Sequence, residues 1–268
     1  MPRKPVLIDV NLSNLDSLPC CGIKNPAHPG VIAKRRWLRQ HLPLGLNAKI
    51  LIDNDGKPCG YIEYLPGEYA WRAVDARGYM FVHCIWNHSR RNRDKGWGSA
   101  MLRACLRDAT AAGMNGVAAL TREGPWSAGA ALFDANRFKL VDTAPLDYQL
   151  WVRKLNPRAA NPAFKDCSEH AARFQDKLTL VTSEQCPYAV KFTAEIRNAA
   201  QQLFSIEPRV VELSSHEDAQ SAPTTYAVFS VLSGGHVLAD HPISRTRFCN
   251  IMRSLEFPTR RNRTHILT

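Results

Sequence analysis

The sequence predicts an α/β protein with two domains, and three observations lead to this prediction. An apolar stretch at residues 79–86 runs into a basic, glycine-containing turn and then into an amphipathic helix. Two further apolar stretches, 48–53 and 59–64, flank an Asn-Asp-Gly-Lys turn at 54–57, which is a hairpin signal. A stretch of small residues with two prolines, 155–163, interrupts the pattern and is expected to be a linker between the domains.

The composition is that of an ordinary globular protein. The chain has 268 residues, of which 45% are hydrophobic and 22% charged, so it can bury a substantial core and is expected to form two domains. It contains no apolar run long enough to span a membrane, and the apolar residues 6–8 are too few for a signal peptide. We therefore expect a cytoplasmic protein with no membrane partner.

The charge and the cysteine content limit which metals, cofactors and macromolecules the protein is expected to bind. The eight cysteines form no Cys-x-x-Cys pair and show no zinc-ligand spacing, so reduced thiols and no metal are expected. The net charge of +11 suits a nucleic acid or an anionic cofactor. No RNA-binding aromatic motif or helix-turn-helix pattern is present, so the sequence disfavours a nucleic-acid partner.

The remaining elements of the first domain follow in order. Residues 116–121 are expected to form a strand. Residues 127–136 are expected to form a helix with Ser127 as its N-cap. Two final strands are expected at 138–141 and 147–152.

The turn at residues 90–98 is the most informative segment. It carries four basic side chains, and it opens a helix whose N-terminus adds a partial positive charge. Glycines at 96 and 98 remove side chains where a ligand would approach the backbone. The turn therefore predicts a site for a polyanion, most simply a pyrophosphate. Its spacing matches neither GxxxxGK[ST] nor GxGxxG.

The pattern Arg93-x-x-Gly96-x-Gly98 resembles the acyl-CoA pyrophosphate loop of the GNAT superfamily of N-acetyltransferases. The resemblance covers roughly residues 5–155. It implies a GNAT-like domain over 1–155, with a mixed, mainly antiparallel sheet and flanking helices. Residues 132–138 resemble a second motif of the family, with two departures. Phe133 stands where the family often has a tyrosine that acts as the general acid. Arg137 stands where the family usually has a glycine.

The resemblance also implies a co-substrate and its ligands. Acetyl-CoA or another acyl-CoA would bind, without a metal. The backbone of Cys84, Ile85 and Trp86 would pair with the pantetheine arm where the sheet splays. The pyrophosphate would be held by the following residues of the basic turn and the helix start: Arg91, Arg93, Lys95, Gly96, Trp97, Gly98 and Ser99.

An amine acceptor is mostly protonated at neutral pH, so transfer requires a base. Glu63, inside an otherwise apolar strand, is the first candidate; the alternative is a carboxylate facing solvent. His83 is the second, although a histidine in such a strand is more often a core residue. Glu123, just after a strand, is the third.

The second domain is expected over 173–268, after a linker at 156–172. Strands are expected at 177–182, 209–213, 222–229 and 236–238, with a helix from Pro187 to about residue 204 and a Gly234-Gly235 turn. This order, with Cys186-Pro187-Tyr188 at a strand-to-helix turn, resembles a thioredoxin-like fold. The whole chain resembles acetyltransferases with a YoaP-like C-terminal domain.

Cys186 is the candidate thiol site of that domain. Its place at a helix N-terminus predicts a lowered thiol pKa. Ala189 stands where a dithiol enzyme has its second cysteine, so no Cys-x-x-Cys disulfide can form. Cys186 is then either a monothiol site or the remnant of a dithiol site on a structural domain.

The sequence therefore favours an acyltransferase that moves an acyl group, expected to be acetyl, from acyl-CoA to a small nucleophile, expected to be an amine. The alternative is a thiol-redox or thiol-handling protein centred on Cys186 whose first domain binds a CoA-like ligand without turnover. A nucleic-acid binder using the positive charge is the third hypothesis. The identity of the acceptor and the oligomeric state stay open.

Overall fold

The computed structural model describes residues 5–87 and 95–255. The chain forms two compact units. Unit 1 comprises residues 1–26, 35–70 and 74–165. Unit 2 comprises residues 27–34, 71–73 and 166–268.

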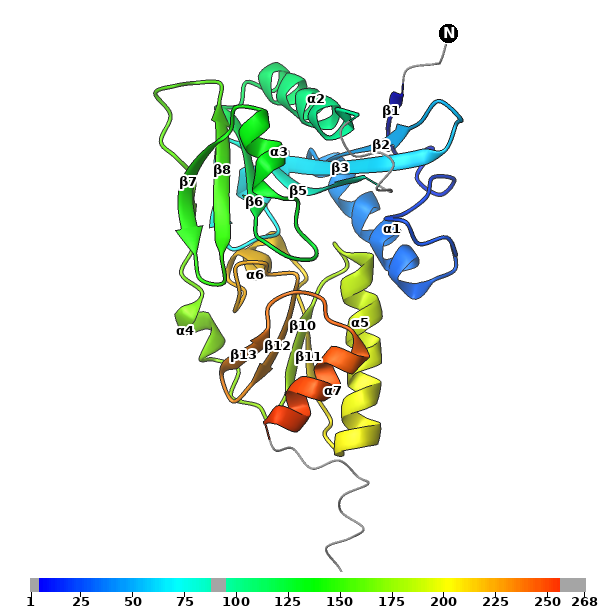
Figure 1. The fold of residues 1–268 in the computed structure, drawn as a ribbon, viewed down its shortest axis with the longest axis vertical. Coiled ribbons are helices and arrows are strands. Elements are labelled where there is room, and N and C mark those ends of the chain that lie inside the picture. Colours follow the sequence, from blue (N-terminus) through cyan, green and yellow to red (C-terminus); the bar gives the residue numbers. More distant parts are fainter. Residues whose placement is uncertain (1–4, 88–94, 256–268) are drawn as a thin grey trace, which may run out of the picture. The chain divides into compact units, whose positions relative to one another are not determined.

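Unit 1 is built on a seven-stranded sheet with the order β1-β2-β3-β5-β6-β8-β7 (Figure 1). Only β5 and β6 run parallel, and all other neighbours are antiparallel, which confirms the expected mixed, mainly antiparallel sheet. The strands are β1 (Val6–Asp9), β2 (Asn47–Ile52), β3 (Pro58–Pro66), β5 (Met80–Asn87), β6 (Gly116–Thr121), β7 (Lys139–Ala144) and β8 (Tyr148–Lys154).

The two faces of this sheet carry different clusters. On one face, α2 (Trp97–Ala111) and α3 (Ala130–Ala135) cover a core that includes Ile62, Tyr64 and Val82. On the other face, Phe81, Ala118 and Leu150 form a second core with the segment around β4 (Val74–Asp75). Side chains alternate between the two faces along a strand. Membership of one cluster or the other therefore identifies the face on which a strand residue lies.

One helix of unit 1 differs from its expected bounds. The helix expected at 127–136 begins at Ala130, and Gly129 is its N-cap. Ser127 does not cap it, because its hydroxyl accepts a hydrogen bond from the Arg122 N–H at 3.0 Å.

The expected linker also differs from its prediction. It contains a short strand, β9 (Ala163–Phe164), and one helical turn, α4 (Ser168–Ala171). β9 is held by antiparallel pairing with β4.

Arg137 has a left-handed backbone (φ 63°) where the family motif has a glycine. We expect Arg137→Gly to raise the free energy of unfolding by about 0.5–1 kcal/mol. The left-handed conformation costs an L-residue roughly 1–2 kcal/mol, and the larger unfolded-state entropy of glycine offsets part of that gain. Lys139→Gly, in β7, is the control and should lower stability. Urea unfolding of both variants checks this; a destabilised Arg137→Gly would contradict it.

Unit 2 contains a four-stranded sheet with the order β11-β10-β12-β13. β10 (Thr179–Thr182) runs parallel to β11 (Arg209–Glu212), whereas β12 (Phe229–Ser233) and β13 (His236–Ala239) are antiparallel to their neighbours. α5 (Pro187–Ala199) continues as a π-helical turn to Phe204, close to the end that the sequence predicts.

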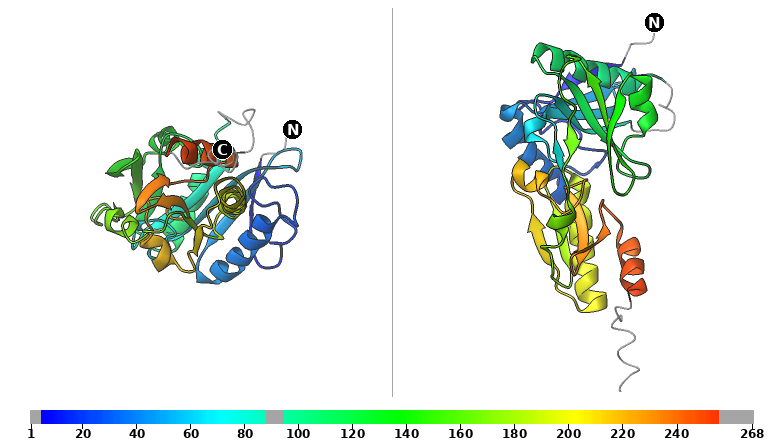
Figure 2. Two further views of the ribbon diagram at one scale, coloured as in Figure 1. Left: turned by 90° about the horizontal axis from the view of Figure 1, so that it is seen from below. Right: turned by 90° about the vertical axis from the view of Figure 1, so that its left-hand side faces the viewer.

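Two further helices complete unit 2. They are α6 (His216–Gln220) and α7 (Arg245–Ser254). α7, red in Figure 2, packs against the α5 segment, and the rings of Phe204 and Phe248 lie 6.0 Å apart. The strand expected at 222–229 is wrong for all but its last residue. Residues 224–227 form a turn in which Ala227 is left-handed (φ 63°), so the strand begins only at Phe229.

Candidate active site

The parallel pair β5 and β6 opens partway along its length. Their pairing runs only from Met80–Val117 to Val82–Ala119, while β5 continues to pair with β3 as far as Asn87. The residues of β5 beyond Val82 are therefore paired on the β3 side, and Cys84, Ile85 and Trp86 are partly exposed. An extended ligand with amide groups can hydrogen-bond along such an edge as a strand does.

A β-bulge in β5 lies next to this opening. Glu63 pairs with Cys84 and Tyr64 pairs with Val82, so His83 is the extra residue. Ile62 and Ile85 pack on the α2 face, so the alternation places Glu63 and Cys84 on the opposite face. The His83 ring contacts Phe81 and Trp37 at centroid distances of 5.6 Å and 6.4 Å, which places it on that face too.

The structure brings Glu63 and His83 together. Glu63 is 0% exposed, so the alternative of a carboxylate facing solvent is wrong. The Tyr61 hydroxyl donates a hydrogen bond to Glu63 Oε2 at 2.5 Å, and His83 Nδ1 lies 3.8 Å from Glu63 Oε1. A buried carboxylate is costly unless such partners accompany it. Tyr61 and His83 therefore help the fold to accommodate the buried Glu63 carboxylate.

Tyr61 is the residue of this cluster that the sequence reasoning missed. It lies two positions before Glu63 on the same strand and therefore on the same face. Burial, followed by the nearby Glu63 and Cys21, raises the pKa of Tyr61 well above its usual value. The phenol therefore stays protonated at neutral pH and acts as a hydrogen-bond donor. The Tyr-x-Glu spacing in a strand was the available signal.

Glu123 does not join this cluster. It is exposed and lines a cavity of about 500 Å³ at the end of β6. Thr121 lines the same cavity and, two and four positions along β6, shares a face with Ala119 and Val117, which pack against α2. The cavity therefore lies on the face opposite Glu63. This separates Glu123 from the other two base candidates.

The start of α2 carries part of the expected phosphate site. Gly96 is the N-cap, with a left-handed backbone (φ 71°) and open space around its Cα. The ammonium group of Lys95 lies 5.0 Å from the centre of the Trp97 ring. The free N–H groups of the first helical turn attract anions. Arg91 and Arg93 lie outside the described residues.

Two other residues of this segment, Gly98 and Ser99, contact α3 and its C-cap. A Cβ atom at position 98 would lie 2.8 Å from Leu132 Cδ1, so Gly98 allows α2 and α3 to approach closely. The Ser99 hydroxyl accepts a hydrogen bond from Asn136 Nδ2 at 2.9 Å. Phe133 is buried against Phe138 in the same core and offers no hydroxyl near a ligand.

The lowered pKa expected for Cys186 is wrong. Burial raises the pKa of the Cys186 thiol above its usual value, although the N–H groups of Ala189 and Tyr188 and the cations Lys34 and Arg72 oppose the shift. Lys34 and Arg72 belong to the same unit. Desolvation of the thiolate therefore outweighs the helix N-terminus. All eight cysteines lie within the described residues and are free thiols.

We expect alkylation of Cys186 by iodoacetamide to reach half of its maximal rate at a pH above that of a free cysteine. The reason is that only the thiolate reacts, and burial disfavours it. Peptide mass spectrometry separates this cysteine from the other seven, and Cys186→Ser identifies its peptide. A midpoint below that of a free cysteine would contradict the assignment.

A curated relative is similar over both units. An uncharacterized N-acetyltransferase of Bacillus subtilis, YoaP, is 27% identical over 252 residues, which are 92% of this chain and 98% of the relative. No protein-family model matches the chain. The relative favours acyl transfer over the thiol-redox alternative.

Solved structures are similar to about three fifths of the chain. yncA of Salmonella typhimurium, a provisionally assigned acetyltransferase solved with acetyl-CoA, is 18% identical, with a TM-score of 0.45, over 59% of this chain and 98% of its own. A phosphinothricin acetyltransferase of Sinorhizobium meliloti, also with acetyl-CoA, is 21% identical, with a TM-score of 0.42, over 60% and 94%.

Within residues 5–87 and 95–255, no helix has the length and apolar character needed to cross a bilayer. Over the same ranges, no three side chains from His, Cys, Asp and Glu are grouped as a metal ion would require.

Proposed function

We propose that the protein is an acyl-CoA-dependent N-acyltransferase that transfers an acetyl group to a small amine. The observation that carries the proposal is the opened edge of β5, which lies beside a buried carboxylate on the neighbouring strand. The similarity to the N-acetyltransferase of Bacillus subtilis over most of both chains supports it.

The acyl-CoA would lie along the opening between β5 and β6. Its pantetheine amides would pair with the backbone of Cys84, Ile85 and Trp86, the part of β5 that β6 does not pair. A backbone N–H of this edge would polarise the thioester carbonyl. The pyrophosphate would bind at the start of α2, where a Cβ atom built on Gly96 would have no described atom within 4 Å.

Glu63 would serve as the base. It lies on the strand next to β5, its register partner is Cys84, and it is held by Tyr61. Removal of a proton makes the amine nucleophilic, and it attacks the thioester carbonyl. The C–N bond forms, the C–S bond breaks, and CoA leaves as a thiolate. A thiolate is a good leaving group, so the absence of a hydroxyl at Phe133 does not prevent transfer.

We propose that unit 2 includes a thioredoxin-like domain over residues 173–268, following a GNAT-like domain over 1–155. The strand order β11-β10-β12-β13, with one parallel pair, and a helix that begins after Cys186 support this. Ala189 is completely buried, so the position of the second cysteine has become a core position. The domain then has an accessory role and no dithiol chemistry.

The test is transfer of a labelled acetyl group. The protein is incubated with acetyl-CoA carrying ¹³C in its acetyl group and a panel of primary amines, amino acids and hydroxylamines. Mass spectrometry then detects the acetylated product. We expect product that depends on both the protein and the acceptor. Retention of the label in acetyl-CoA and acetate with every acceptor would contradict the proposal.

A further inference from the structure

A completely buried carboxylate needs a neighbouring group to exchange protons with a ligand. Glu63 is 0% exposed, and the side chains of Tyr61 and His83, which can both carry a proton, adjoin its oxygens. The Tyr61 hydroxyl is within hydrogen-bond distance, at 2.5 Å from Oε2. His83 Nδ1 is 3.8 Å from Oε1, which is too long for a hydrogen bond. Tyr61 is therefore directly connected to the carboxylate.

Tyr61 also extends toward the opened edge of β5. It is the register partner of Trp86, and their rings stack with centroids 6.2 Å apart and planes inclined by 30°. Trp86 is one of the partly exposed β5 residues proposed to hold the acyl-CoA arm. Tyr61 thus contacts Glu63 through its hydroxyl and the ligand-binding strand through its ring.

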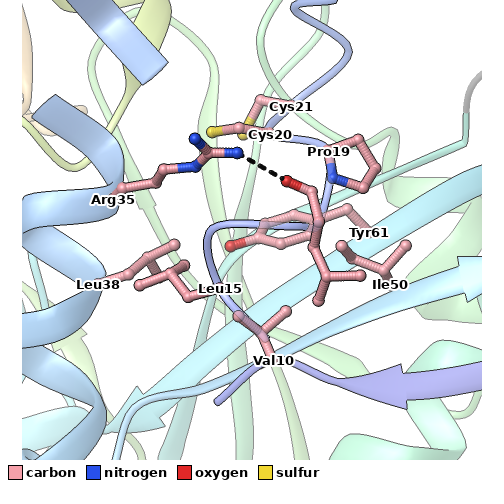
Figure 3. Close-up of a pocket in the computed structure, with 10 residues that line it drawn as sticks. Val10, Leu15, Pro19, Cys20, Cys21, Arg35, Leu38, Ile50 and Tyr61 are labelled. Atoms are coloured by element: carbon pink, nitrogen blue, oxygen red, sulfur yellow. Dashed lines mark hydrogen bonds between the residues drawn. The ribbon is translucent and has the colours of Figure 1, made fainter. Parts of the chain in front are cut away.

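The Tyr61 ring also lines a small cavity (Figure 3). Cys21 of the N-terminal loop and Arg35 of α1 (Pro29–His41) line this cavity together with the Tyr61 ring. Arg35 donates a hydrogen bond to the Leu18 carbonyl at 3.2 Å, so its guanidinium is held by the loop. The titratable groups around Tyr61 include Glu63 on its own strand, Cys84 on β5, Cys20 and Cys21 on the loop and Arg35 on α1.

We infer that the Tyr61 hydroxyl relays the proton from the acceptor amine to Glu63, an inference that rests on the proposed acyl transfer. As the amine nitrogen attacks the thioester, its proton passes to the Tyr61 oxygen, directly or through one water. The Tyr61 O–H proton moves to Glu63 Oε2 in the same step. Tyr61 ends neutral and Glu63 ends protonated. The proton then returns along the same path to the departing CoA thiolate.

The same strand provides a matched control for this role. Tyr64 is also buried on β3, and its hydroxyl donates to Asp108 Oδ2 at 2.5 Å, but it faces α2. Tyr61→Phe and Tyr64→Phe therefore each remove one phenol–carboxylate hydrogen bond, buried for Tyr61 and partly buried for Tyr64. Only Tyr61→Phe interrupts the path to Glu63. A purely structural role would affect both variants alike.

The experiment measures kcat, the KM for acetyl-CoA and the solvent isotope effect on kcat for the wild type and both variants. We expect Tyr61→Phe to lower kcat about 100-fold, the usual size of a proton-transfer contribution. Its KM should stay within twofold, and its solvent isotope effect should differ from that of the wild type. Tyr64→Phe should keep the wild-type kcat and isotope effect.

A second variant keeps the hydroxyl in place. Replacing Tyr61 by 3-fluorotyrosine retains the hydrogen bond but makes the phenol more acidic. Because the hydroxyl and its hydrogen bond to Glu63 are kept, this variant should restore most of the kcat that Tyr61→Phe loses. A 3-fluorotyrosine variant as slow as Tyr61→Phe, or a Tyr61→Phe variant that folds and turns over at the wild-type rate, would overturn the relay while leaving acyl transfer intact. A wild type that transfers nothing would overturn both.

Discussion

The variant Glu63→Gln should lose roughly 100-fold or more in kcat, because general base catalysis contributes about 10²–10⁴ in rate. Glutamine has nearly the size and shape of glutamate. It can keep the contact with Tyr61, but it cannot take up a proton. The KM for acetyl-CoA should change little, since Glu63 lies on the strand beside β5 and is not expected to touch the cofactor. Steady-state kinetics with a saturating acceptor check this.

Two matched variants locate the base. Glu123→Gln removes the exposed carboxylate on the opposite face of the sheet and should keep the wild-type kcat. His83→Gln removes the side chain that lies 3.8 Å from Glu63 and tests the second candidate. If Glu63→Gln turns over at the wild-type rate across the pH range while either of the other two fails, Glu63 is not the base.

The variant Gly96→Glu should bind acetyl-CoA at least about tenfold more weakly, a loss of about 1.4 kcal/mol. A carboxylate at the start of α2 would repel the pyrophosphate and compete with it for the helix N–H groups. Calorimetry with acetyl-CoA measures the change in Kd.

Gly113→Glu is the matched control for this variant. Gly113 follows the C-terminal end of α2, has nearly the same backbone (φ 67°, against 71° for Gly96), and likewise has open space around it. The two variants add the same charge and the same backbone strain at opposite ends of one helix. Equal weakening by both would attribute the effect to helix stability and contradict a phosphate site at Gly96.

Local patterns predicted most strands and helices of the chain. The strand at 116–121 has the predicted bounds, and the hairpin around residues 54–57 and the helix after Pro187 were predicted to within two residues at most ends. These elements have strong periodicity and turn residues that fit them. The strand at 222–229 failed because a left-handed Ala227 interrupts the extended backbone before Phe229, and no local pattern indicates that conformation.

The site was only partly predictable because it depends on burial and register. The sequence indicated Glu63 and His83 separately, but the bulge that puts both on one face arises from the pairing of β3 with β5. The hydrogen bond from Tyr61 follows from the same strand geometry. For Cys186, the helix N-terminus was visible in the sequence, whereas the desolvation that outweighs it depends on tertiary packing.

Hydrogen–deuterium exchange with and without acetyl-CoA tests the central claim, that acyl-CoA binds along the opened edge of β5. We predict that peptides containing Cys84, Ile85 and Trp86 gain protection when acetyl-CoA is added, because the ligand would pair with the side of β5 that β6 does not pair. Peptides of β12 in unit 2 should exchange at the same rate in both conditions. Unchanged exchange over 84–86 at saturating acetyl-CoA, or protection confined to the start of α5 at Cys186, would contradict the account.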